Sequence, residues 1–158
     1  QEVAKIGLGI GMNVIYYDLH NDKVNLKLEF FDRQILNFKL EKSSFIEVLS
    51  KSDFITLHVP AQKEYVIGNK EFDLMKDGIG LINAARGGVV DEVALDKNIS
   101  DGKVSFAALD TFENEPNPEI KLLMNPKISL TPHIGAATNE AQDRIGVELA
   151  DQIIEILK

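Results

Sequence analysis

Three residues with reactive side chains each follow an apolar run in this sequence. Arg86 comes directly after "IGLINAA", His133 follows "ISLTP", and Glu115 lies a few residues beyond "VSFAAL". An arginine can bind a carboxylate through paired hydrogen bonds, and a histidine can exchange a proton near neutral pH. A neighbouring carboxylate stabilises the charged imidazolium. These groups supply what the reduction of a 2-keto acid needs, provided that a bound cofactor delivers the hydride.

Taken singly, each of these side chains has a simpler interpretation. An arginine is more often a surface residue, a lone histidine is more often structural, and the carboxylates Asp110, Glu113 and Glu115 could be merely solvated. Their shared position favours a site, because ligands of open α/β sheets bind at the carboxyl ends of the strands. His58 ends another apolar run at the same edge, whereas His20 is expected to be exposed.

The elements that position these residues are predicted from alternating apolar runs and amphipathic stretches, a pattern typical of βαβ units. It indicates an α/β fold with a doubly wound parallel sheet of the Rossmann type. Helices are expected to start at Ser43 or Ser44, Asn69, Asp91 and Asn139. Residues 19–42 fit poorly and are expected to hold a short helix and a strand near residues 36–40. The predicted strands are residues 14–17, 53–59, 79–84, 104–109 and 128–131.

Residues 7–11, Gly-Leu-Gly-Ile-Gly, look like a nucleotide-binding loop. Such a loop reads G-x-G-x-x-G, follows a strand and opens a helix. Here the third glycine comes one position early, "QEVAKI" before it favours a helix, and "MNVIYYD" after it favours a strand. The order is reversed, so these glycines are predicted to end a helix rather than bind phosphate.

Asp18 ends the predicted strand that follows these glycines. In dinucleotide-binding folds an acidic residue about 20 positions after the glycine loop binds the ribose. Counting back from Asp18 by about 20 residues passes the start of the sequence. The true glycine loop and its preceding strand are therefore expected upstream of Gln1. The alternative is that Asp18 merely starts a turn.

Composition narrows the possible functions. A length of 158 residues suits one domain, and the net charge of −8 disfavours nucleic acid as a partner. The absence of cysteine excludes disulfides and thiolate metal sites and fits a reducing compartment such as the cytoplasm. No metal is expected, because the three histidines lack ligand spacing. No membrane contact is expected, because no apolar run approaches the roughly 20 residues that a spanning helix needs.

The sequence resembles the NAD-binding domain of the D-isomer-specific 2-hydroxyacid dehydrogenases. The resemblance rests on the ordered segments "DFITLHVP", "LINAARGGVVDEVAL", "AALDTFENEP" and "LTPHIGAATNEAQDRI", from Asp53 onward. The family's glycine fingerprint and its substrate domain have no counterpart, and the stretch between Asp18 and Asp53 is longer than usual. We therefore expect residues 1–158 to form a dinucleotide-binding domain that is incomplete at its N-terminus, without a substrate domain.

The resemblance implies an NAD-dependent enzyme that interconverts a D-2-hydroxy acid and its 2-keto acid. It implies a catalytic set in which Arg86 holds the substrate carboxylate, His133 exchanges the proton and Glu115 is the carboxylate partner of His133. The implied NAD contacts are Asp18, His58, Val59, Pro60, Ala84, Ala85, Arg86, Asp110, His133, Gly135 and Ala136.

Within the family the resemblance is strongest to the phosphoglycerate dehydrogenases, so 3-phosphoglycerate, in serine biosynthesis, is the first expected substrate. Glyoxylate, hydroxypyruvate and D-lactate stay open, because substrate-reading residues belong to the missing domain. A different class is a dinucleotide-sensing module like the corepressors built on this fold, although a sensor need not keep Arg86, Glu115 and His133. A homodimer formed through this domain is expected, and the fragment alone is expected to be inactive.

Overall fold

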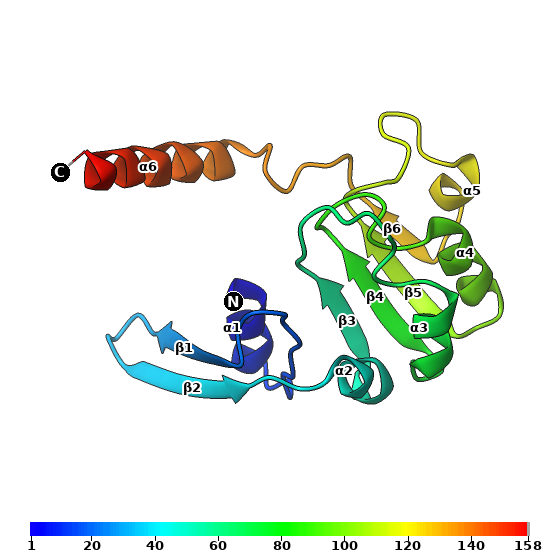
Figure 1. Ribbon diagram of the computed structural model, residues 1–158, viewed down its shortest axis with the longest axis horizontal. Coiled ribbons are helices and arrows are strands. Elements are labelled where there is room, and N and C mark those ends of the chain that lie inside the picture. Colours follow the sequence, from blue (N-terminus) through cyan, green and yellow to red (C-terminus); the bar gives the residue numbers. More distant parts are fainter. Residues whose placement is uncertain (158) are drawn as a thin grey trace. The chain divides into compact units, whose positions relative to one another are not determined.

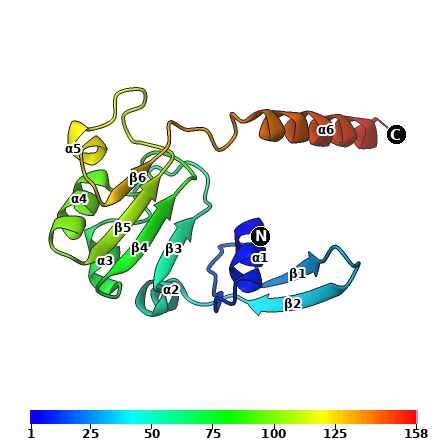
Figure 2. The same cartoon turned by 180° about the vertical axis from the view of Figure 1, so that it is seen from behind.

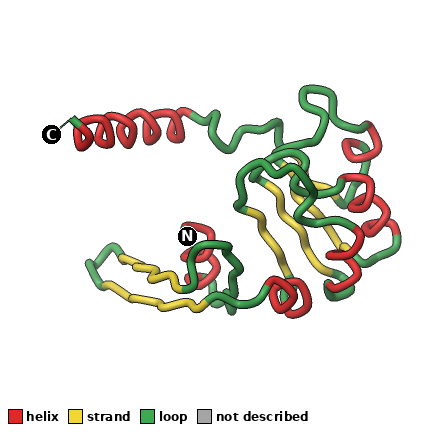
Figure 3. The backbone as a smooth tube through the Cα atoms, viewed as in Figure 1, coloured by secondary structure: helices red, strands yellow, loops and turns green. Residues whose placement is uncertain are grey.

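The computed structural model of the protein describes residues 1–157 and contains two compact units. Residues 1–52 and 74–76 form the first unit, and the remaining described residues form the second. Figure 1 labels the helices and strands of both, and Figure 3 distinguishes them from the loops by colour. Apart from Asp18, every predicted site residue belongs to the second unit.

The first unit contains two helices and a β-hairpin. These elements are α1 (Glu2–Gly9), β1 (Lys23–Glu29), β2 (Ile35–Glu41) and α2 (Phe45–Lys51). The hairpin strands are antiparallel, with Leu26 opposite Phe38. Because α1 contacts β1, the apolar face of the hairpin has a partner, and Leu26 is only 1% exposed.

The glycines of residues 7–11 end α1, as predicted. The Met12 N–H donates to the Gly7 carbonyl at 2.9 Å, and the Gly11 N–H donates to the Leu8 carbonyl at 3.0 Å. Gly11 has a φ of +85°, the left-handed conformation that commonly closes the last turn of a helix. These N–H groups therefore satisfy the end of α1 and do not form a phosphate-binding loop.

Two predictions for the N-terminal part were wrong. Residues 14–17 do not form a strand, since no ladder includes them in the described chain; the Tyr16 carbonyl instead accepts a hydrogen bond from the Ser43 N–H. The expected short helix within residues 19–42 is replaced by β1, while the strand expected near residues 36–40 lies inside β2. Alternating polar and apolar residues in "KVNLKLE" and "ILNFKLE" favour paired strands, because side chains along a strand alternate between its faces.

The second unit is built on a parallel sheet in the order β3-β4-β5-β6. Its strands are β3 (Phe54–Leu57), β4 (Ile79–Asn83), β5 (Val104–Leu109) and β6 (Ile128–Leu130), which confirms the four predicted strands after residue 50. The inner strand β4 is nearly continuously buried. In the outer strand β3 burial alternates, with Ile55 inside and Phe54 exposed.

Helices α4 (Glu92–Ser100), α5 (Ile120–Leu123) and α6 (Asn139–Ile156) belong to the same unit, as does α3 (Asn69–Leu74) up to Asp73. α3 and α4 lie along one face of the sheet in both views of Figures 1 and 2, and α4 packs on β5. The core of this unit is mainly aliphatic and also contains Phe72 of α3, which is fully buried. Its fully buried members include Ile79, Leu81, Leu95, Ile99 and Val104.

The predicted helix starts were correct for two helices and displaced for two others. Ser44 caps α2 and Asp91 caps α4, as predicted. The cap of α6 is Thr138 rather than Asn139, since the Thr138 hydroxyl accepts from the Ala141 N–H. Asn69 is the first residue of α3 rather than its cap, because the Glu71 carboxylate accepts from the Gly68 N–H at that end.

Helix α6 contributes little to the core. Ala141 is 4% exposed, whereas Val147 and Ile154 are 64% and 53% exposed. None of the helices within residues 1–157 combines the length and apolar character that crossing a bilayer requires.

Removing the cap of α4 tests the local origin of this helix. The Asp91 carboxylate accepts from the Ala94 N–H at 2.9 Å, so Asp91→Ala should lower the free energy of unfolding by about 1 kcal/mol. Asp91→Asn keeps an acceptor at the cap and should cost less. Urea denaturation measures both, and an Asp91→Ala protein as stable as the wild type would contradict the capping role.

Candidate functional site

The predicted site residues gather where the parallel strands end. Parallel strands place all their carboxyl ends at one edge of a sheet, and the arrowheads of β3 to β6 point the same way in Figure 2. Segments following four strands therefore meet there. They carry His58, Val59 and Pro60 after β3, Ala84, Ala85 and Arg86 after β4, Asp110 and Glu115 after β5, and His133, Gly135 and Ala136 after β6.

Glu115 and His133 form a direct pair. His133 Nδ1 lies 2.8 Å from Glu115 Oε2, and both side chains are partly exposed. The other carboxylate oxygen, Oε1, accepts from the Phe112 N–H at 2.9 Å. The bond with His133, followed by the bond from Phe112, holds the pKa of the Glu115 carboxyl below its usual value. Glu115 is therefore ionised at neutral pH and oriented toward the imidazole.

Asp110 holds the turn that carries His133. Its Oδ1 accepts from the Thr131 hydroxyl at 2.6 Å and from the Ile134 N–H at 2.9 Å, and its Oδ2 accepts from the Gly135 N–H at 2.9 Å. Burial alone would raise the pKa of the Asp110 carboxyl, but these hydrogen bonds outweigh it and lower that pKa. His133 sits in this turn with a φ of +54°, a conformation costly for a side-chain-bearing residue. The Asp110 bonds offset that cost and fix the backbone turn from which the imidazole extends.

The turn that carries Arg86 is fixed by the buried side chain of Asn83, which is 2% exposed. Asn83 Oδ1 accepts from the Ala85 N–H at 3.1 Å, and its Nδ2 donates to the Arg86 carbonyl at 3.0 Å. The exposed Arg86 guanidinium donates to the Ala85 carbonyl. A guanidinium carries five N–H donors, so this single bond leaves donors that can bind a carboxylate.

Gly87 brings the loops after β4 and β5 into direct backbone contact. A Cβ added at Gly87 would lie 1.9 Å from the Phe112 carbonyl oxygen, far inside van der Waals contact. Only glycine allows two backbones to approach this closely. The contact joins the residue after Arg86 to the residue whose N–H holds Glu115.

The remaining predicted residues are positioned differently. The Thr56 hydroxyl and His58 Nε2 are 3.0 Å apart, and loss of water around the imidazole lowers the pKa of His58. Asp18 lies in the first unit, where its Oδ1 accepts from the N–H groups of His20 and Asn21 at 2.7 and 2.8 Å. These bonds lower the pKa of the Asp18 carboxyl and match the turn interpretation. Its role in ribose binding stays a prediction.

Sequence reasoning missed several residues that build this site. Asn83 ends a strand inside an apolar run, and a polar residue in such a run is a signal of a buried hydrogen-bonding role. Glu92 follows a helix cap and reads as an ordinary first-turn residue, yet it is only 6% exposed. Its burial depends on the loop after β5, and the local sequence carries no signal of that contact.

Small residues lie at this edge of the sheet. Small residues there, Ala84, Gly135 and Ala136, are exposed and let a flat ligand approach the backbone. Within residues 1–157, no group of three or more His, Cys, Asp and Glu side chains is arranged to hold a metal ion.

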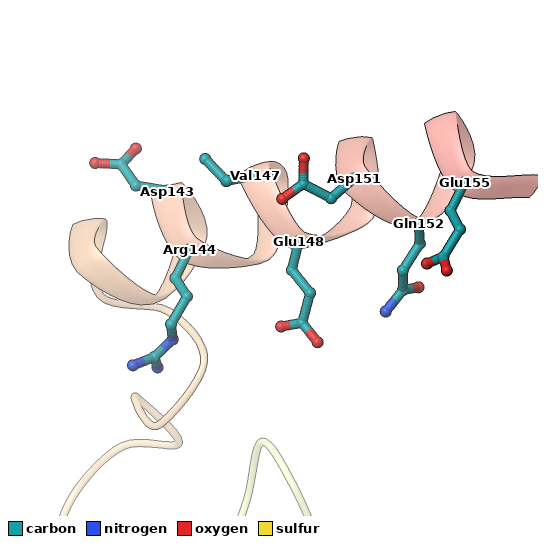
Figure 4. Close-up of a pocket in the computed structure, with 7 residues that line it drawn as sticks. All are labelled: Asp143, Arg144, Val147, Glu148, Asp151, Gln152 and Glu155. Carbon is teal, nitrogen blue, oxygen red and sulfur yellow. The ribbon is translucent and has the colours of Figure 1, made fainter. Parts of the chain in front are cut away.

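A surface hollow elsewhere does not compete with this site. Figure 4 shows its lining side chains, all of which come from the single helix α6, so no second element closes it. It contains none of the strand-end residues. Its lining consists of Asp143, Arg144, Val147, Glu148, Asp151, Gln152 and Glu155.

Replacing Gly87 with alanine tests the backbone contact. The added Cβ must displace the Phe112 carbonyl, and overpacking of this kind costs at least about 1–3 kcal/mol of unfolding free energy. Gly146→Ala is the matched control, since an added Cβ there meets no atom within 4 Å. Urea denaturation compares the two variants. Equal stability of Gly87→Ala and the wild type would contradict the close approach.

The chain is similar to the NAD-binding domains of known 2-hydroxyacid dehydrogenases. The family described as D-isomer specific 2-hydroxyacid dehydrogenase, NAD binding domain, matches residues 1–135. The hydroxypyruvate reductase of Thermotoga maritima is 43% identical over 162 residues, covering 99% of this chain and 49% of that protein. The D-3-phosphoglycerate dehydrogenase of Archaeoglobus fulgidus is 42% identical over 165 residues, covering 99% of this chain and 29% of that protein.

A solved structure with a similar fold is the D-lactate dehydrogenase of Aquifex aeolicus complexed with NAD and lactic acid. It is 32% identical, has a TM-score of 0.73, and the match covers 98% of this chain and 49% of that one. The chain spans about half, or less, of the length of these relatives. The chain belongs to the D-isomer-specific 2-hydroxyacid dehydrogenase family, of which it represents the NAD-binding domain.

Proposed function

We propose that this chain is the NAD-binding part of an oxidoreductase that interconverts a D-2-hydroxy acid and its 2-keto acid. The observation that carries this proposal is the 2.8 Å pair of His133 Nδ1 and Glu115 Oε2 at the ligand-binding edge of the sheet. A histidine with one nitrogen fixed by a carboxylate keeps its other nitrogen for a substrate proton.

His133 exchanges the proton in this proposal. In the direction of oxidation, Nε2 takes the proton of the substrate hydroxyl, and in reduction it returns the proton to the ketone oxygen. Glu115, ionised at neutral pH, accepts from Nδ1 and stabilises the imidazolium that forms. NAD, when bound, supplies the hydride acceptor.

Arg86 orients the substrate in this proposal. Its donors bind the substrate carboxylate, and its positive charge polarises the adjacent carbonyl group. The Asn83 side chain fixes the turn from which the guanidinium extends. Asp110, in the loop after β5, fixes the turn that carries His133, so both functional side chains extend from anchored turns.

The substrate we propose first is 3-phosphoglycerate, which places the enzyme in serine biosynthesis. Support comes from the 42% identity to the Archaeoglobus fulgidus D-3-phosphoglycerate dehydrogenase. The similarity to a hydroxypyruvate reductase and a D-lactate dehydrogenase keeps hydroxypyruvate, glyoxylate and D-lactate as alternatives. A dinucleotide-sensing module is less well supported, because sensing does not call for the Glu115–His133 pair.

Further proposals concern the setting of the enzyme. We propose that residues 1–158 are a dinucleotide-binding domain and that this domain on its own is inactive. We propose a homodimer in the cytoplasm, in keeping with a cysteine-free sequence. The net charge of −8 supports the proposal that nucleic acid and anionic membrane surfaces are not partners.

Replacing His133 with alanine in the complete enzyme tests the proton-transfer role. We expect kcat to fall by roughly 10²–10⁴-fold, the usual contribution of a general acid–base group. His20→Ala is the matched control, since this histidine lies outside the strand edge, and its kcat should be unchanged. Steady-state turnover of a panel of D-2-hydroxy acids provides the measurement. A His133→Ala enzyme with wild-type kcat would refute the assignment.

Comparing NAD with NADP tests the role of Asp18. The lowered pKa of the Asp18 carboxyl keeps it negative at neutral pH, so it should repel the 2′-phosphate of NADP. The wild type should favour NAD in kcat/KM by more than about tenfold, and Asp18→Asn should narrow this preference. Asp32→Asn removes an equal charge from the hairpin loop between β1 and β2, and it should leave the preference for NAD unchanged. A wild-type preference for NADP would count against the assignment.

A further inference from the structure

Glu92 and Glu113 exchange hydrogen bonds between carboxylate and backbone. Glu92 Oε1 accepts from the Glu113 N–H at 2.8 Å, and Glu113 Oε1 accepts from the Glu92 N–H at 3.0 Å. Glu92 is the first residue of α4, and Glu113 lies in the loop after β5. The two residues are 21 positions apart, so the exchange joins two separate segments.

A third segment joins the same point. Glu113 Oε2 accepts from the Tyr65 hydroxyl at 3.1 Å, and this bond raises the pKa of Tyr65. The segment after Tyr65 is tied to the end of the β4–α4 loop, since the Asp91 N–H donates to the Ile67 carbonyl at 2.9 Å. Glu113 therefore lies at the meeting point of three loop segments.

The exchange brings together two acidic side chains, of which Glu92 is buried. Glu92 is only 6% exposed, and its second carboxylate oxygen, Oε2, is buried without a hydrogen-bond partner. Burial raises the pKa of Glu92, and the negative charge of Glu113 adds to that effect. Burying a carboxyl group with one orphaned oxygen costs free energy, so a purely apolar residue would pack there more cheaply. What the carboxylate adds is a fixed acceptor for one N–H group.

That N–H group belongs to the loop that carries Glu115. The Glu113 N–H, held by Glu92, directly follows Phe112 in the chain, and the Phe112 N–H holds Glu115 Oε1 at 2.9 Å. The Phe112 carbonyl is pressed against Gly87 on the other side. Two successive backbone N–H groups therefore serve different carboxylates, one fixing the loop and the other fixing Glu115.

We propose that Glu92, with Glu113, is a positioning residue that holds the residue 112–113 backbone so that Glu115 is correctly oriented toward His133. Its catalytic meaning rests on the function proposed above, whereas the coupling from Glu92 to Glu115 can be tested without it. In the described chain the side chains of Glu92 and Glu113 are hydrogen-bonded to backbone N–H groups and to Tyr65, and not to Glu115 or His133.

The decisive comparison is Glu92→Ala against Glu92→Gln. Both variants remove the same charge, so they change the electrostatic repulsion on Glu115 equally. Only glutamine keeps an acceptor for the Glu113 N–H. In Glu92→Ala the pKa of the Glu115 carboxyl should rise toward its usual value, because Glu115 loses its aligned donors, whereas in Glu92→Gln it should stay low. Carbon-detected NMR titration of the Glu115 carboxyl measures this.

Variants of Glu113 test the same coupling if Glu92→Ala fails to fold. Glu113→Ala leaves the Glu92 side chain in place but removes the acceptor of the Glu92 N–H and of Tyr65. Glu113→Ala should also raise the pKa of the Glu115 carboxyl. Glu113→Gln, which keeps an oxygen for the Glu92 N–H, should raise that pKa less. A merely structural role would lower stability in the alanine variants without separating the Glu115 titrations of alanine and glutamine.

Measuring kcat of the complete enzyme and its Glu92 variants distinguishes a failure of this inference from a failure of the proposed function. In the complete enzyme, kcat of Glu92→Ala should fall by up to about 100-fold, since small misplacements of catalytic groups cost that much. NAD affinity should be retained, and Glu92→Gln should recover most of kcat. If the alanine and glutamine variants share one Glu115 pKa, the positioning role is wrong. If the wild type turns over no 2-hydroxy acid, the proposed function fails while the titration still decides the coupling.

Discussion

The backbone of Gly87 lies so close to the Phe112 carbonyl that one added carbon would come within 1.9 Å of its oxygen. This contact holds the loop after β4 against the loop after β5. Arg86 directly precedes Gly87 in the chain, and the Phe112 N–H donates a hydrogen bond to Glu115. The exchange between Glu92 and Glu113 strengthens the same junction from the start of α4. The functional edge therefore depends on two loops whose backbones touch, which is possible only where a side chain is missing.

Two carboxylates of the loop after β5 then fix His133, the proposed acid–base group. Asp110 accepts three hydrogen bonds from the turn that contains His133, and Glu115 contacts the imidazole itself. Anchored turns matter because His133 has a positive φ, which an unsupported loop would not retain. Catalytic groups held in this way need little rearrangement when a substrate binds. Asp110 anchors the turn, whereas Glu115 contacts the imidazole, so the two interactions can be altered separately.

Much of the second unit was predictable from the sequence, because its signals are local. Apolar runs predicted β3 to β6, and Asp91 predicted the start of α4. The glycines of residues 7–11 were correctly assigned to a helix end, since their neighbours have the wrong order for a phosphate loop. The strand predicted for residues 14–17 was wrong, for a different reason. A run of β-branched and aromatic residues indicates that a strand is possible, but a strand needs a neighbour to pair with, and no ladder includes these residues in the described chain.

The sequence by itself determined the residue types at each strand end and, through ordered motifs, the family. It supplied Arg86, Glu115 and His133 as candidates and predicted the edge on which the latter two meet. Only the tertiary structure decided how they are held: the turn bonded by Asp110, the contact at Gly87 and the exchange between Glu92 and Glu113. The reason is the separation along the sequence between the residues that interact. Helix caps and strand patterns depend on residues a few positions apart. These contacts instead join segments more than 20 positions apart, and their distances depend on how the whole sheet packs.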